Sequence, residues 1–217
     1  SSKDSNDMMP KYICVEGVIG AGKTSMARLL GERMNARVIY EKPEENPFLA
    51  DFYKDPARYA FQVQLFFLLS RYRQQQESLQ PDLFQPATVS DYLFAKDRIF
   101  AHLNLEDREL FLYDRVAGLL ERDILKPDLV VYLQSSIERL MANIQKRGRS
   151  YEKEMSEEYI RSLNEAYNRF FFHYSDTPLL VVNSALIDFV NNREHLDELV
   201  NQILRPHSGI EYYSPAR

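Results

Sequence analysis

The 217-residue sequence has no tryptophan, only seven glycines and a single cysteine, Cys14. One cysteine excludes an intrachain disulfide and any zinc site built from several cysteines. Cys14 lies in an apolar run, which is typical of a buried structural thiol, so we expect a reducing cytoplasm as the location. No apolar run approaches the roughly 18–20 residues of a membrane span, and no membrane partner is expected.

The sequence also lacks a basic excess. Its 27 Lys and Arg residues stand against 32 Asp and Glu residues, which gives a formal net charge of −5. A duplex-binding domain usually carries excess positive charge to displace phosphate counterions, so no nucleic-acid partner is expected. Residues 1–10 are polar and contain no hydrophobic segment, so they are not a secretory signal. We expect them to be a disordered or artificially added start.

What is present is an ordinary globular composition, with 45% hydrophobic and 27% charged residues. Short apolar runs alternate with segments of helical periodicity, which is typical of an α/β fold with a mostly parallel sheet covered on both faces. Five strands are expected, over 12–16, 37–40, 87–90, 128–133 and 179–182. We expect one domain over residues 11–205 and a tail of no assigned role over 206–217.

Three of the seven glycines fall within six residues, in a stretch that matches G-x-x-x-x-G-K-[ST] between an expected strand and an expected helix. In such a P-loop the backbone N–H groups surround a phosphate, and the following helix presents its positive end to the same anion. Lys23 is expected to reach the β- and γ-phosphates of ATP, and the Thr24 hydroxyl to bind Mg²⁺. The expected ATP-binding residues are Gly17, Gly20, Ala21, Gly22, Lys23, Thr24 and Ser25.

A P-loop alone does not separate a kinase from a switch. The sequence has no Asn-Lys-x-Asp element of the kind that guanine-specific GTPases carry. Glu41 follows the apolar segment 38–40, at the end of an expected strand, where open α/β sheets place their ligand chemistry. A carboxylate there suits an alcohol acceptor, whose proton must be removed. The alternative is an ordinary solvated glutamate at a strand end.

The sequence resembles the deoxyribonucleoside kinase family, and most of all its bacterial deoxyadenosine and deoxyguanosine kinase branch. The resemblance runs from about residue 12 to 204, and the segments that carry it are 41–48, 52–56, 60–64, 90–92, 96–101 and 147–152. It implies a P-loop kinase fold with a five-stranded parallel sheet, helices on both faces, a small arginine-bearing lid over about 146–154, and a homodimer. It also implies phosphoryl transfer from Mg²⁺-ATP to a deoxyribonucleoside 5′-hydroxyl in nucleotide salvage.

The family's catalytic roles map onto matching positions. The resemblance makes Glu41 the base that takes the proton from the 5′-hydroxyl, and Asp91 a ligand of Mg²⁺ beside Thr24. Arg147 and Arg149 match the lid arginines that contact the transferring phosphoryl group. Asp91 capping the following helix, and a solvated loop at 147–149, are the structural alternatives.

The family's substrate-binding roles map onto five further residues: Tyr53, Gln64, Arg71, Asp97 and Glu152. Tyr53 and Glu152 match the pair that binds the sugar 3′-hydroxyl, and Gln64 matches the residue that reads the base edge. Arg71 and Asp97 match a pair near the base that favours a purine, then deoxycytidine, then thymidine. The alternatives are a packing role for Tyr53, a polar helix position for Gln64, and a structural salt bridge for Arg71 and Asp97.

Three positions depart from the family pattern. Tyr92 stands where the Asp/Glu-Arg-Ser motif has its arginine, and Lys96, one helical turn away, could substitute for the missing charge. Lys42 interrupts the usual Glu-Pro-Val run. Asn143 aligns with an arginine that stacks on the donor adenine in relatives, with Arg139 one turn away and segment 187–189 bordering the adenine.

Two other functions remain open from the sequence. A nucleoside monophosphate kinase of the thymidylate-kinase type would share the P-loop and lid but would not depend on Glu41. A nucleotide-binding regulatory module would have no small acceptor at all.

Overall fold

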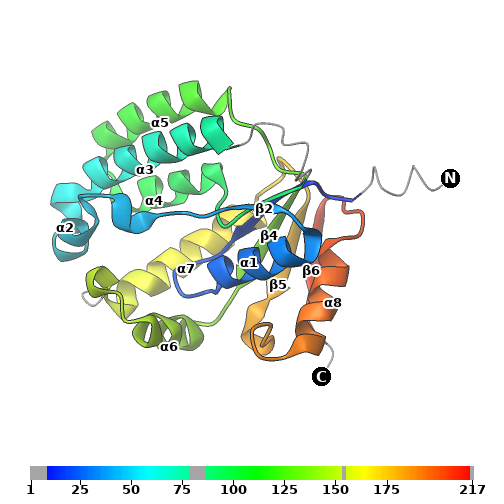
Figure 1. Ribbon diagram of the computed structural model, residues 1–217. Helices are drawn as coiled ribbons and strands as arrows, with labels where there is room; N and C mark the ends of the chain where they lie inside the picture. Colours follow the sequence, from blue (N-terminus) through cyan, green and yellow to red (C-terminus); the bar gives the residue numbers. More distant parts are fainter. Residues whose placement is uncertain (1–8, 79–86, 153–154, 216–217) are drawn as a thin grey trace.

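The computed structural model describes residues 9–78, 87–152 and 155–215 (Figure 1). Most of the start expected over residues 1–10 lies outside the described residues, as do residues 153–154 of the expected lid. None of the helices within these ranges combines the length with the apolar character that a bilayer crossing needs.

Six parallel strands form one sheet in the order β2-β3-β1-β4-β5-β6. The strands are β1 (Tyr12–Glu16), β2 (Arg37–Ile39), β3 (Thr88–Ser90), β4 (Leu129–Gln134), β5 (Leu179–Asn183) and β6 (Ile210–Tyr213). The α/β class and the parallel sheet are confirmed. The expected total of five strands is wrong, because a sixth strand extends the sheet.

The additional strand, β6, comes from the segment 206–217 that the sequence marks only as a tail. It pairs with β5 from Leu179↔Ile210 to Val182↔Tyr213. All four of its residues are exposed or half-buried. Four residues at a sheet edge, without a buried apolar run, give too weak a pattern to be recognised from sequence.

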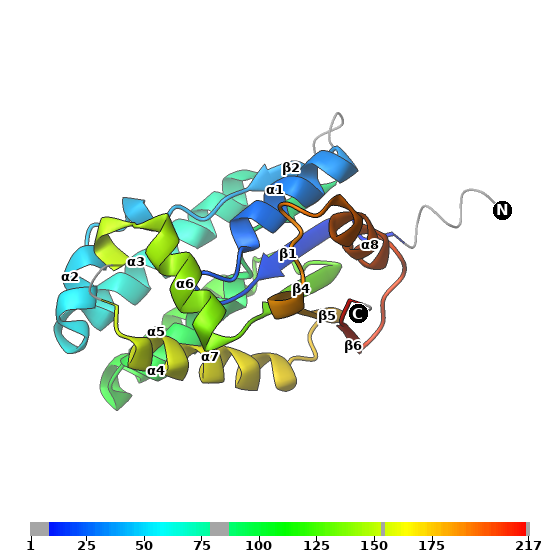
Figure 2. The same ribbon diagram turned by 90° about the horizontal axis from the view of Figure 1, so that it is seen from below.

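Helices cover both faces of the sheet. They are α1 (Lys23–Met34), α2 (Leu49–Lys54), α3 (Pro56–Ser78), α4 (Asp97–Asn104), α5 (Asp107–Glu121), α6 (Ile137–Arg147), α7 (Glu157–Phe172) and α8 (Arg193–Ile203). Short 3₁₀ turns are η1 (Pro43–Glu45), η2 (Phe94–Lys96), η3 (Ser150–Glu152) and η4 (Ser184–Leu186). Figure 2 shows α1 and α8 on one face of the sheet and α4 and α7 on the other.

The main core lies between the central strands and these helices. All five residues of β1 are buried, as are five of the six residues of β4, which is typical of strands covered on both faces. Cys14 is fully buried, as expected for a structural thiol. A smaller apolar cluster that includes Leu68, Phe94 and Tyr113 joins α3, η2 and α5.

The strand order places three sequence-distant segments at one edge of the sheet. β3 pairs with both β1 and β2, so the carboxyl ends of these three strands lie side by side. The P-loop follows β1, Glu41 follows β2 by two residues, and Asp91 directly follows β3. This edge is where open α/β sheets bind their ligands.

Candidate active site

A cavity of about 700 Å³ opens at this edge. Fourteen of the residues expected at the site line it: Gly20, Ala21, Gly22, Lys23, Thr24, Ser25, Glu41, Tyr53, Gln64, Arg71, Asp91, Arg147, Arg149 and Glu152. The two others lie behind its wall. A Cβ on Gly17 would meet the Leu133 carbonyl oxygen at 3.2 Å, and Asp97 is bonded to Arg71.

The P-loop has the geometry of a phosphate site. Gly20 has a φ of 89°, and a Cβ there would lie 2.7 Å from the carbonyl oxygen of Leu140, so only glycine fits. Helix α1 begins at Lys23, after Gly22, with no side-chain cap. Its first N–H groups are therefore available to an anion at the positive end of the helix.

Glu41 lies among three cations. Its Oε2 contacts Lys96 Nζ at 2.7 Å and Lys23 Nζ at 3.1 Å, and its Oε1 is bonded to the Arg71 guanidinium. Burial by itself would raise the pKa of Glu41, but Arg71, Lys23 and Lys96 outweigh it and hold the pKa well below the usual range. Glu41 is therefore an ionised carboxylate held by three ion pairs and not a solvated strand-end residue.

Two further charged residues complete this cluster: Lys96, which the sequence offered as a substitute for the missing motif arginine, and Glu16, which sequence reasoning did not assign to the site. The Lys96 side chain is 1% exposed and contacts Glu16 Oε1 at 3.2 Å as well as Glu41. Glu16 accepts N–H groups from Gly17 (2.9 Å) and Leu93 (3.0 Å). The available signal was a glutamate at the end of a buried strand, directly before the P-loop.

Tyr92, which replaces the family arginine, belongs to the protein interior. It is fully buried, and its hydroxyl donates to Gln74 Oε1 at 2.6 Å. The guanidinium carbon of Arg71 lies 5.6 Å from the centre of its ring and Lys96 Nζ lies 6.0 Å from it. The cations at this position are thus supplied by neighbouring residues, and Tyr92 packs beneath them.

Asp91 links the P-loop to the segment that carries Glu41. Its Oδ2 accepts the Thr24 hydroxyl at 2.9 Å, and its Oδ1 accepts the Glu41 backbone N–H at 2.6 Å. No side chain caps η2 or α4, so the helix-cap alternative for Asp91 is wrong. Burial raises the Asp91 pKa, against the opposing charge of Lys23.

The oxygens of Thr24 and Asp91 fit Mg²⁺, a cation that binds through one or two protein oxygens together with phosphates and water. The described residues contain no group of three or more His, Cys, Asp or Glu side chains arranged to hold a metal. A partial donor set beside a phosphate loop is typical of Mg²⁺ in kinases.

The inner end of the cavity is polar, and some of its buried oxygens have no hydrogen-bond partner. Arg71 is bonded to Asp97 and lies over the Phe67 ring, with 4.4 Å from its guanidinium carbon to the ring centre. Gln64 is 1% exposed, and its Oε1 has no partner. Asp97 Oδ2 is also buried without a partner. Buried acceptors left open in this way are unfavourable unless a ligand satisfies them.

The expected lid follows α6, which ends at Gly148 with a φ of 64°. Arg147 holds Glu152 through two hydrogen bonds, Nε to Oε1 at 3.1 Å and Nη2 to Oε2 at 2.5 Å. Arg149 and Tyr53 line the same cavity. The segment 147–149 is thus part of the cavity wall and not a loop directed only into solvent.

The far end of the cavity is bordered by 187–191. Arg139 donates to the carbonyl oxygens of Ala185 (2.7 Å) and Ile187 (3.0 Å), so its guanidinium holds this segment in place. Asn143 donates to the carbonyl oxygen of Gly20 at 2.8 Å. Both side chains thus brace the cavity wall through hydrogen bonds to backbone carbonyl oxygens.

Comparisons with known proteins agree with this geometry. The family profile for deoxynucleoside kinase matches residues 13–207. A deoxyguanosine kinase from Bacillus subtilis is 32% identical over 198 residues, covering 88% of this chain and 95% of that protein. A deoxyadenosine kinase from Dictyostelium discoideum is 37% identical over 184 residues, covering 82% of this chain and 74% of that protein.

Among solved structures, a deoxyadenosine kinase from M. mycoides with bound dATP matches with a TM-score of 0.77 and 25% identity, covering 89% of this chain and 98% of that chain. The P-loop, the strand-end carboxylate and the cavity they share all lie within residues 13–207, which match this family. The chain belongs to the deoxynucleoside kinase family and is an ATP-dependent phosphotransferase.

Proposed function

We propose that the enzyme transfers the γ-phosphoryl group of ATP to the 5′-hydroxyl of a purine deoxyribonucleoside, deoxyadenosine or deoxyguanosine. The observation that carries the proposal is the 3.1 Å contact between Glu41 and Lys23, the lysine of the P-loop. This contact supports Glu41 as the base, because the P-loop lysine is the residue expected to bind the transferring phosphate. Relatives named as deoxyguanosine and deoxyadenosine kinases support the purine.

In this mechanism the 5′-oxygen attacks the γ-phosphorus while Glu41 accepts the hydroxyl proton. The new bond joins O5′ to phosphorus, and the bond from phosphorus to the β–γ bridging oxygen breaks, so ADP leaves with the electron pair. Arg147 and Arg149 stabilise the charge on the phosphoryl oxygens, which is the main demand of phosphoryl transfer. Thr24 and Asp91 would hold Mg²⁺, which neutralises phosphate charge when bound.

For the nucleoside, Tyr53 and Glu152 bind the sugar 3′-hydroxyl, and Gln64 and Arg71 face the base. Asp97, which does not line the cavity, holds Arg71. Gln64 offers both a donor and an acceptor to adjacent polar atoms of a planar base. Its open Oε1 is an acceptor. It suits an exocyclic amine, which adenine, guanine and cytosine carry and thymine lacks.

The two other functions are not favoured. A monophosphate kinase of the thymidylate type needs no carboxylate at the acceptor, whereas Glu41 is ionised and held by three cations here. A regulatory module that phosphorylates no small molecule would leave the unpartnered Oε1 of Gln64 in the cavity unexplained. The family match supports a catalytic role over both.

The direct test is product formation from ATP and each of the four deoxyribonucleosides, read by chromatography of the nucleoside monophosphates. We expect the purines to have the highest kcat/KM, deoxycytidine to follow and thymidine to be last. Thymidine phosphorylation without purine activity would contradict the base assignment. ATP binding without product from any nucleoside would contradict the function.

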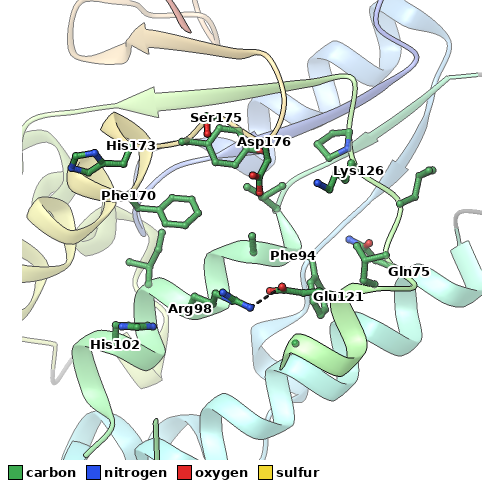
Figure 3. A pocket seen from close by; sticks show the side chains of 18 of the residues that line it. Gln75, Phe94, Arg98, His102, Glu121, Lys126, Phe170, His173, Ser175 and Asp176 are labelled. Carbon is green, nitrogen blue, oxygen red and sulfur yellow. Dashed lines mark hydrogen bonds and ion pairs between the residues drawn. The ribbon is translucent and has the colours of Figure 1, made fainter. Parts of the chain in front are cut away.

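We further infer that the enzyme is a homodimer. A groove of about 850 Å³ lies between α4, α5 and α7, at the opposite end of the strands from the P-loop. Figure 3 shows Arg98 and Glu121 paired across it, with His102, Phe170 and Asp176 around its walls. A two-fold interface places one patch against itself, and this patch carries charges of both signs beside apolar surface.

The groove gives a test of the dimer. Ala166 on α7 lines it and Ala57 on α3 is exposed elsewhere. Ala166→Arg should convert a dimer into a monomer in sedimentation velocity, and Ala57→Arg should not. A wild-type monomer at micromolar concentration would contradict the inference.

The remaining expectations complete the proposal. We infer a single catalytic domain over 11–205 with a lid over about 146–154, and a cytoplasmic location. The buried, unpaired Cys14 supports a reducing compartment. The lid is supported by the two arginines and Glu152 that line the cavity.

A further inference from the structure

Glu41, the base of the proposed function, is held by three cations that differ in their other interaction partners. Lys23 belongs to the P-loop, and donor phosphates compete for its ammonium. Arg71 contacts Oε1 and is also bonded to Asp97, at the inner end of the cavity. Lys96 contacts Oε2 and is paired on its other side with Glu16.

Lys96 lines the cavity, but its position is fixed by buried carboxylates. It ends η2, and its side chain is 1% exposed. Its second partner, Glu16, is fully buried and is held by two backbone N–H groups, one of which comes from the first residue of the P-loop. Backbone N–H groups therefore fix Glu16, and Glu16 in turn fixes the Lys96 ammonium.

These contacts form a continuous connection from the P-loop backbone to the base. Gly17 N–H bonds to Glu16 Oε2, Glu16 Oε1 contacts Lys96, and Lys96 contacts Glu41 Oε2. When donor phosphates bind the Lys23 ammonium, Lys96 is the remaining ammonium on Oε2, the oxygen that it shares with Lys23. The Glu41 carboxylate must accept a proton from a hydroxyl oxygen that attacks phosphorus in line with the leaving group. A fixed contact keeps the carboxylate in the orientation that this step needs.

We propose that Lys96 is a positioning residue of the phosphoryl transfer, which holds the Glu41 carboxylate at a fixed place relative to the P-loop while Lys23 engages the donor phosphates. This inference rests on the proposed role of Glu41. It assigns Lys96 no contact with the nucleoside or the donor.

The charge state of Lys96 supplies an independent readout. Burial lowers its pKa to about 8, with Lys23 and Arg71 acting in the same direction and Glu16 and Glu41 opposing them. The groups that face it are Glu16 from β1, Lys23 from α1, Arg71 from α3, Glu41 after β2, and Asp91 and the Tyr92 ring after β3. Neutral Lys96 cannot hold Glu41 by charge, so turnover should fall on the alkaline side.

The test compares Lys96→Met and Lys96→Arg with the control Lys42→Met. Lys42 is adjacent to Glu41 in sequence, but its side chain is 58% exposed and lies 3.7 Å from Glu45 at the surface. We expect Lys96→Met to lower kcat by about tenfold or more. The KM for ATP should stay within about threefold of wild type, and Lys42→Met should match wild type in both.

Lys96→Arg should recover turnover at neutral pH and remove the alkaline decline, since arginine stays protonated throughout this range. Circular dichroism melting curves verify that each variant is folded. If Lys96→Met does not fold, the test is the comparison of wild type with Lys96→Arg in the alkaline part of the kcat–pH profile. The inference is overturned if folded Lys96→Met matches Lys42→Met, or if Lys96→Arg keeps the wild-type alkaline decline. A wild-type enzyme inactive on all four deoxyribonucleosides would instead remove the proposed function.

Discussion

The ammonium of Lys23 lies 3.1 Å from Oε2 of Glu41, so the residue expected to bind donor phosphates is paired with the residue expected to take the acceptor proton. Each weakens the other's chemistry while they are paired. The Glu41 carboxylate and the two carboxylates of Glu16 and Asp91 outweigh burial and raise the pKa of Lys23. We therefore expect donor binding to separate the pair and to leave Glu41 with one cation fewer, which would make it a stronger base.

Replacing the base should separate chemistry from donor binding. Glu41→Gln removes the proton acceptor and should lower kcat by about 10²–10⁴-fold. Because Lys23 then lacks its carboxylate partner, affinity for a non-hydrolysable ATP analogue should stay at the wild-type level or increase. Calorimetric titration and steady-state turnover measure the two effects. The control Glu45→Gln changes an exposed glutamate nearby, and turnover of Glu41→Gln equal to it would refute the role of Glu41.

The P-loop should reject a side chain at Gly20. In Gly20→Ala the new Cβ would lie 2.7 Å from the Leu140 carbonyl oxygen, at a φ that L-residues rarely adopt. We expect ATP affinity to fall by about tenfold or more, since the loop must shift. Gly118→Ala is the matched control, because a Cβ there meets nothing within 4 Å inside α5. It should raise the free energy of unfolding by about 0.5–1 kcal/mol and leave ATP affinity unchanged.

Gln64 should matter for the substrate more than for stability. Its Oε1 is buried without a partner, an arrangement that costs about 1–3 kcal/mol in the empty protein. Gln64→Leu should therefore leave the melting temperature equal or higher, while kcat/KM for the preferred deoxyribonucleoside falls by about 10- to 100-fold. Gln76→Leu, on the exposed side of α3, serves as control. A lower melting temperature with unchanged kcat/KM would assign Gln64 a structural role.

The fold should lose stability in alkali. Burial raises the pKa of Cys14 to about 12, and burial likewise raises the pKa values of Tyr132 and Tyr167 above their usual range. These groups hold their protons more tightly in the folded state than in the unfolded state. Their stabilisation is thus complete below about pH 9 and is lost as the pH rises through the folded-state values.

Urea unfolding curves at about pH 7.5, 9 and 10.5 test this dependence. The midpoint should decrease from the first to the last. A midpoint that is constant over this range would contradict the prediction.

The sequence could predict those parts of the site that depend on local chemistry. The P-loop is contiguous, and Glu41 and Asp91 follow short apolar strands whose ends must meet in a parallel sheet. The contact between Lys96 and Glu16 joins residues 80 positions apart and depends on how η2 packs beneath the P-loop. No periodicity or spacing reports such a contact.

Local irregularity limits prediction in the same way. The segment after Glu41, with Pro43 and Pro47, reads as irregular, yet it contains α2 over Leu49–Lys54. A six-residue helix has too few turns to show a periodic pattern, and it is held by packing of Leu49 and Phe52 against α3. Tertiary contacts, and not propensity, decide such elements.

The pairing of β6 with β5 has a consequence for how the protein stays dispersed. Four of the five residues of β5 are buried and apolar, so its free edge would be an aggregation-prone template for another chain. β6 occupies that edge with a short strand whose side chains are exposed or half-buried. Removing residues 206–217 would therefore expose the unpaired edge of β5 to other chains. The first effect would be loss of solubility, before any change in the geometry of the active site.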